Sequence, residues 1–215
     1  MVPVWDYALM TEPLPAAVRA SLGWARRQGI GDAGNQFHYY RLTAPAQAPE
    51  GEGERLLFGG YDALYFLGGD TDPRRAQHPE TFAVLADHLV QTFPQLADVR
   101  ISHSWGGMID TCSRFSPFWG SALGGRVAYV LGFTGLGVGA SHFGAGTALE
   151  LLDRLDTERT RLQMVRSKPI PFPPEPLKWV GIQLTRKSLA RADAHQGRRN
   201  LWLRALDKVG LGFDS

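Results

Sequence analysis

Residues 130–146 read VLGFTGLGVGASHFGAG, an apolar strand followed by a glycine-rich turn and the start of a helix. Glycine permits a positive φ and lets another group approach the backbone closely. The first amides of a helix have no internal partners and carry a partial positive charge. Such a turn suits an anion or a polarised ring oxygen. The same sequence also fits a tight strand-to-helix connection that binds no ligand. Both interpretations, a ligand-binding turn and a purely structural one, stay open at this point.

The turn departs from the standard nucleotide-binding motifs. Gly135, Gly137 and Gly139 give GxGxG, but Ala140 stands at the sixth position in place of a further glycine. An acidic residue about 20 positions later on a second strand is also missing. No Lys-Ser or Lys-Thr pair follows, as a phosphate-binding P-loop requires. The turn therefore needs support from the rest of the chain.

The elements next to the turn follow from hydrophobic patterning. Arg126–Gly132 (RVAYVLG) resembles a short buried strand. A helix is predicted from about Ser141 to Asp153, with three residues facing inward: Ala145, Leu149 and Leu152.

Upstream, the chain reads mostly as strands. Val2–Leu9 begins one at once, and Val99–Cys112 is a long extended segment. Phe37–Thr43 and Leu56–Gly60 flank a loop at Ala44–Glu54 that is rich in Pro, Gly and Glu, which predicts a long hairpin.

Helices are predicted near the start, in the middle and towards the end of the chain. Pro15–Trp24 suits a short helix, and Pro79–Phe93 has apolar residues on one face with a proline at each end. The proline-dense segment Lys168–Pro176 predicts an extended linker, and amphipathic helices are expected at Leu177–Asp193 and Arg198–Leu206.

Composition narrows the class of protein. Hydrophobic residues make up 44% and charged residues 20%, as in globular proteins. No apolar run is long enough to span a membrane, the first residues do not resemble a signal peptide, and there is a single cysteine, so we expect a cytoplasmic protein. The six histidines match no standard metal-ligand spacing, so no metal site is expected.

Charge is unevenly distributed. Arg159–Ser215 holds 12 basic and 4 acidic residues, a net +8, whereas the whole chain carries +2. A basic tail can bind nucleic acid or membrane phosphates. Because this tail has no recognisable nucleic-acid-reading motif, we interpret it as the solvated surface of helices and expect no nucleic-acid partner.

Several segments in order carry a family resemblance: TEPL at 11–14, FGG at 58–60, WGGMID at 105–110, PFWG at 117–120 and GFTGLGV at 132–138. The ordered set, over about residues 1–155, resembles the D-amino-acid oxidase superfamily of FAD-dependent oxidoreductases. The members meant are the glycine oxidase, sarcosine oxidase and γ-glutamylputrescine oxidase types. The resemblance implies that FAD is the cofactor.

The resemblance also implies an α+β fold. Residues 1–125 would form the substrate-binding region, a mainly antiparallel sheet with flanking helices. Residues 126–155 would form the final strand, glycine turn and helix of the FAD-binding domain, and residues 156–215 a proline-rich linker and basic helical tail. The residues expected to contact FAD are Gly132, Thr134, Gly135, Leu136, Gly137 and Val138, with the helix N-terminus stabilising negative charge on the reduced flavin.

The reaction implied is oxidation of a C–N bond of a small amine or amino acid to an imine. Substrate contacts are expected from His38 and Tyr40, which alternate on one strand and share a face, and from Trp105 and Ile109. Amino-acid oxidases of this superfamily place a carboxylate-binding arginine where this chain has Ile109. That departure favours an amine, or a substrate whose carboxylate is far from the reacting carbon.

The family's N-terminal GxGxxG strand–turn–helix is absent from this sequence, as is its acidic ribose-binding residue. We therefore expect the C-terminal part of a longer enzyme, either a truncated gene model or a chain whose partner supplies the missing half. The alternative is a non-catalytic subunit or interaction module derived from such an oxidase, which would expose an apolar face.

Overall fold

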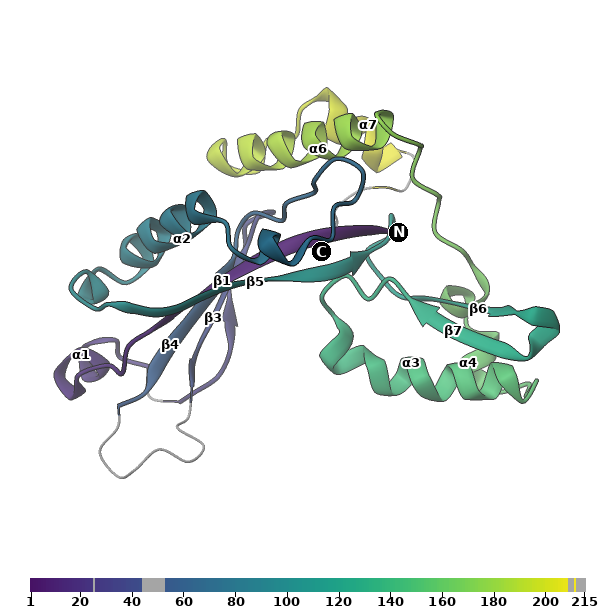
Figure 1. Cartoon of the computed structure of the whole chain (residues 1–215), viewed down its shortest axis with the longest axis horizontal. Helices are drawn as coiled ribbons and strands as arrows, with labels where there is room; N and C mark the ends of the chain where they lie inside the picture. The colour runs from purple at the N-terminus through teal and green to yellow at the C-terminus, as the bar shows by residue number, and fades with distance from the viewer. Residues whose placement is uncertain (25, 44–52, 209–210, 212–215) are drawn as a thin grey trace.

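The computed structural model describes residues 1–24, 26–43, 53–208 and 211. It is an α+β protein built on a five-stranded sheet of order β2-β3-β4-β1-β5 in which all pairings are antiparallel (Figure 1). The strands are β1 (Val2–Thr11), β2 (Ile30–Gly31), β3 (His38–Thr43), β4 (Arg55–Gly60) and β5 (Ile101–Thr111). The predicted strands and the β3–β4 hairpin are confirmed, although residues 44–52 of its loop lie outside the described residues.

One face of the sheet is covered by α2 (Pro79–Thr92), as the apolar periodicity predicts. Leu85 and Leu89 are fully buried against strand residues such as Leu9 and Phe58, which form the main core. The short helix α1 (Ala16–Ser21) lies at the far end of the same layer (Figure 1). Burial of this apolar layer is the main stabilising contribution available to the sheet.

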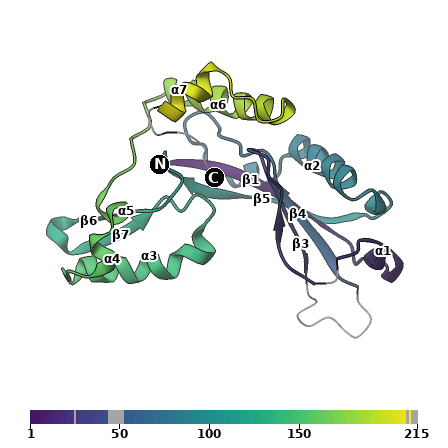
Figure 2. The same cartoon turned by 180° about the vertical axis from the view of Figure 1, so that it is seen from behind.

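A second unit follows β5 and lies at the end of the sheet where β1 begins (Figures 1 and 2). The strands β6 (Phe118–Ala122) and β7 (Val127–Leu131) pair antiparallel and pack on α3 (Gly137–Leu152). The prediction that the strand ending at Gly132 is buried is wrong, because β7 belongs to a two-stranded sheet and Val127 is 41% exposed.

The prediction that Ala145, Leu149 and Leu152 of α3 face inward is also wrong. Gly144 and Thr147 are the buried residues of the helix, whereas Leu149 is 62% exposed and Leu152 is 37% exposed. Trp119 of β6 accounts for this orientation, because its indole Nε1 donates to the Gly144 carbonyl at 3.0 Å. The absence of a Cβ at position 144 lets the aromatic layer of this unit approach the helix backbone.

The C-terminal segments lie across both units. After α4 (Glu158–Arg161) and α5 (Gln163–Arg166), residues 167–176 form the predicted extended linker. Its start is held by Arg114, which donates to the Met164 carbonyl at 2.8 Å and to Ser167 Oγ at 2.8 Å. The predicted helices are confirmed as α6 (Leu177–Ala194) and α7 (Leu201–Lys208). Within the described residues, no helix has the length and apolar character needed to cross a membrane.

Candidate functional site

The glycine turn between β7 and α3 is held by the end of β5. Asp110 Oδ2 accepts the amide of Gly132 at 2.5 Å and that of Phe133 at 3.3 Å, and the Asp110 carbonyl accepts the amide of Thr134 at 3.1 Å. The backbone is left-handed at Gly132, Thr134 and Gly135, with φ of 78°, 51° and 86°. Glycine adopts this region readily, which explains two of the three positions.

The turn leaves several amides available to a ligand. The helix α3 begins at Gly137, four residues before the predicted Ser141, and no side chain caps this end within the described residues. Of the six residues expected to contact a cofactor, Gly132 and Thr134 donate their amides to Asp110 of β5, and Leu136 donates its amide to the Phe133 carbonyl within the turn. The amides of Gly135, Gly137 and Val138 donate to no acceptor in the described part of the chain.

The turn adjoins one face of the large sheet. A Cβ built on Gly135 would lie 3.7 Å from Ile109 Cδ1. Trp105 lies four residues before Ile109 on β5, so the two side chains share a face of the sheet. Trp105 is 37% exposed. The structure therefore brings Trp105, Ile109 and the glycine turn to one side of the molecule.

His38 and Tyr40 lie on the other face, beneath α2. His38 Nδ1 contacts Asp32 Oδ2 at 2.6 Å, and its Nε2 lies 2.9 Å from Nδ1 of His88 on α2. Tyr40 stacks on Phe58 in the main core. These two residues are therefore separated by the sheet from Trp105 and Ile109, with which sequence reasoning had grouped them.

The residue between them, Tyr39, occupies the open face instead. Its hydroxyl donates to Asp6 Oδ2 at 2.7 Å. The ring lies over Gly59, where any Cβ would come within 2.7 Å of the ring. Burial raises the pKa of Asp6, against the lowering effect of the Tyr39 hydrogen bond, and burial together with the nearby carboxylate raises the pKa of Tyr39. Sequence reasoning missed this pair.

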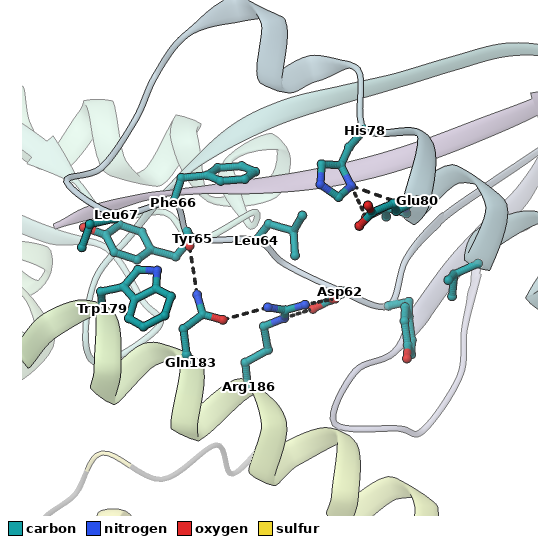
Figure 3. A pocket seen from close by; sticks show the side chains of 13 residues that line it. Asp62, Leu64, Tyr65, Phe66, Leu67, His78, Glu80, Trp179, Gln183 and Arg186 are labelled. Atoms are coloured by element: carbon teal, nitrogen blue, oxygen red, sulfur yellow. Dashed lines mark hydrogen bonds and ion pairs between the residues drawn. The ribbon is translucent and has the colours of Figure 1, made fainter. Parts of the chain in front are cut away.

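A cavity of about 470 Å³ lies elsewhere, between α2, α6 and the segment after β4 (Figure 3). Arg186 of α6 forms a two-point ion pair with Asp62 at 2.5 and 2.6 Å, and Gln183 donates to the Tyr65 carbonyl at 3.0 Å. These contacts dock α6 onto the sheet unit. None of the site residues predicted from the sequence lines this cavity.

Comparison with known proteins places the chain in a family. The family model described as "FAD dependent oxidoreductase" matches residues 1–153. The chain is 31% identical over 159 residues to a gamma-glutamylputrescine oxidoreductase of Escherichia coli, covering 74% of this chain and 32% of that protein.

Two proteins named probable oxidoreductase OrdL are also similar. The one from Haemophilus influenzae is 28% identical over 138 residues, covering 64% of this chain and 27% of the relative. The one from Rhizobium meliloti is 30% identical over 112 residues, covering 47% of this chain and 24% of the relative. The chain thus spans a third or less of the length of these curated relatives. Because the family model covers more than half of its residues, this chain belongs to the family of FAD-dependent oxidoreductases.

Proposed function

We propose that the chain forms the substrate-binding sheet and the flavin-contacting turn of an enzyme that oxidises a C–N bond of a small amine to an imine. In this proposal residues 1–125 bind the substrate, residues 126–155 belong to the FAD-binding domain and residues 156–215 are a linker and helical tail. The observation that carries the proposal is the position of the glycine turn against Ile109 at one side of the sheet. The E. coli relative is named for a putrescine derivative, which agrees with an amine substrate.

The residues of the turn fit FAD. The amides of Gly135, Gly137 and Val138 stand at the uncapped start of a 16-residue helix, where the helix dipole favours negative charge. At Gly139 no atom lies within 4 Å of the position a Cβ would take, so the space beside the first turn of the helix is open. The chemistry that bound FAD supplies is acceptance of a hydride from the carbon of a C–N bond, which leaves an imine that water hydrolyses.

The residues of this chain would position the two reactants. Asp110 holds the turn in its left-handed conformation, so its donors are oriented before a ligand arrives. Trp105 and Ile109 provide an apolar surface next to the turn, which limits access of water to the reacting carbon. The absence of a basic side chain at Ile109 favours an amine over an α-amino acid.

The test is an anaerobic reduction. The purified protein is loaded with FAD and mixed with butylamine in the absence of oxygen, and the visible absorbance of oxidised flavin is followed. We expect the band to bleach and butyraldehyde and ammonia to form in equal amounts. A band that survives a panel of primary and secondary alkylamines would exclude amine oxidation by this chain as it stands.

A second function is favoured by one observation, the exposed apolar face of α3. Val138, Leu149 and Leu152 are 101%, 62% and 37% exposed. We propose that another polypeptide surface covers this face, whether in a catalytic assembly or in a non-catalytic interaction module. Leu149→Ser should leave thermal stability unchanged and reduce binding of a hydrophobic dye. Unchanged dye binding would show that this face of α3 is not the apolar surface that binds the dye.

A further inference from the structure

Asp6 is the one charged residue of β1, and its surroundings are unusual for a carboxylate. Across the sheet it pairs with Gly107 of β5, so the two residues point to the same face. No atom lies within 4 Å of the position that a Cβ on Gly107 would take. The glycine therefore leaves open space directly beside the Asp6 side chain.

Two apolar side chains stand on either side of this space. Trp105 and Ile109 are two residues before and two residues after Gly107, and both share its face of the sheet. Ile109 in turn reaches the glycine turn at Gly135. A group placed over Gly107 would thus meet the Asp6 carboxylate, an indole and an aliphatic side chain, with the turn close by.

The carboxylate of Asp6 has no cation to balance it. Its Oδ2 accepts the Tyr39 hydroxyl at 2.7 Å, but no ion pair joins Asp6 to a basic side chain among the described residues. Burial raises its pKa, because a desolvated carboxylate without a cation is costly. A cationic ligand would offset this cost.

We propose that Asp6 is the recognition group for a cationic alkylamine, whose ammonium group lies over Gly107 between Trp105 and Ile109. The ammonium hydrogen-bonds to the Asp6 carboxylate and contacts the indole face of Trp105, which attracts cations. Tyr39 is a positioning residue that holds the carboxylate from the other side. This assignment rests on the proposed function for its reaction, but it concerns binding alone.

The binding is testable without flavin. The indole N–H signal of Trp105 in the nitrogen-15 spectrum of the chain, assigned with Trp105→Phe, reports on the space over Gly107. We expect butylammonium chloride to shift this signal in a saturable manner at about neutral pH. Neutral 1-butanol and sodium butyrate should have at least about tenfold lower affinity, because neither places a cation beside Asp6.

The decisive comparison is between two acid-to-amide variants. Asp6→Asn should weaken butylammonium binding about tenfold or more, whereas Asp98→Asn, which changes an exposed acid, should leave it unchanged. Equal affinity in Asp6→Asn and wild type, or no shift of Trp105 with butylammonium, would overturn the assignment. Amine oxidation is judged separately by flavin bleaching, so failure of one does not imply failure of the other.

Discussion

Asp110 Oδ2 accepts the backbone amide of Gly132 at 2.5 Å, and this contact joins the last residues of β5 to the glycine turn. Two residues that are 22 positions apart in sequence thereby set where the turn lies relative to the sheet. In the proposed function, this carboxylate would couple the substrate-binding face of β5 to the amides that contact the flavin.

Removal of that carboxylate should loosen the turn. Asp110→Ala leaves the amides of Gly132 and Phe133 without their acceptor, and we expect the free energy of unfolding to fall by about 1–3 kcal/mol. Asp98→Ala, at an exposed position, should change it by less than about 0.5 kcal/mol. Urea denaturation measures both. Equal stabilities of the two variants would mean that Asp110 does not hold the turn.

Two glycines, one in the turn and one in the first turn of α3, should change the stability in opposite directions when replaced by alanine. Gly132 has φ of 78°, and its Cβ would lie 3.0 Å from Cys112, so Gly132→Ala should cost about 1–2 kcal/mol or more. Gly139 is helical and has no neighbour within 4 Å, so Gly139→Ala should gain about 0.5–1 kcal/mol. Thermal or urea unfolding gives both values. A loss at Gly139 as large as at Gly132 would contradict the described backbone.

The raised pKa of Asp6 predicts a pH dependence of stability. Burial lifts the pKa in the folded state above the ordinary 3.8, so the favourable contribution is full below 3.8 and is lost as pH rises through the folded-state pKa. Asp6→Asn does not titrate, so its stability should increase relative to wild type as the pH rises from 3.8 through the folded-state pKa of Asp6. Asp98→Asn is the control. A pH-independent difference between Asp6→Asn and wild type would show that Asp6 is not desolvated.

His88 of α2, which contacts His38 of the sheet, should make stability depend on pH in the opposite direction. Burial, and secondarily the neighbouring His38, lowers the pKa of His88 from its ordinary 6.5. Protonation of His88 therefore disfavours the folded state, and stability should fall as pH drops below 6.5 through the folded-state value. His88→Gln should flatten this fall, whereas His142→Gln on the exposed start of α3 should not. Parallel pH profiles for all three proteins would contradict this role of His88.

The sequence predicted the strands, α2, the linker and the C-terminal helices, because hydrophobic periodicity and proline positions report local structure directly. It did not predict which face of the sheet each strand residue occupies. His38 and Tyr40 share a face by alternation alone, but only the β3–β4, β1–β4 and β1–β5 registers together put Tyr39 on the same face as Trp105. A shift of one residue in register exchanges the two faces.

Asp6 left a signal in the sequence, as a lone carboxylate inside the apolar strand VPVWDYALMT. No comparable signal in the sequence indicates the orientation of α3. Apolar residues at Leu149 and Leu152 suggest burial, but the side of the helix that packs on β6 is decided by the close approach of Trp119 to Gly144. That choice depends on tertiary contacts between segments that local periodicity does not describe.

The most direct test of the central claim is a comparison of FAD with ADP in nitrogen-15 spectra of the chain. We predict that FAD shifts the amide signals of Gly135, Gly137 and Val138, while ADP does not, because the proposed function places the isoalloxazine end of the cofactor against the turn. Gly23 and Gly197, which also have positive φ but lie outside the site, should stay unshifted with either ligand. Identical shifts with FAD and ADP, or none at these three amides, would contradict the flavin-contacting role of the turn.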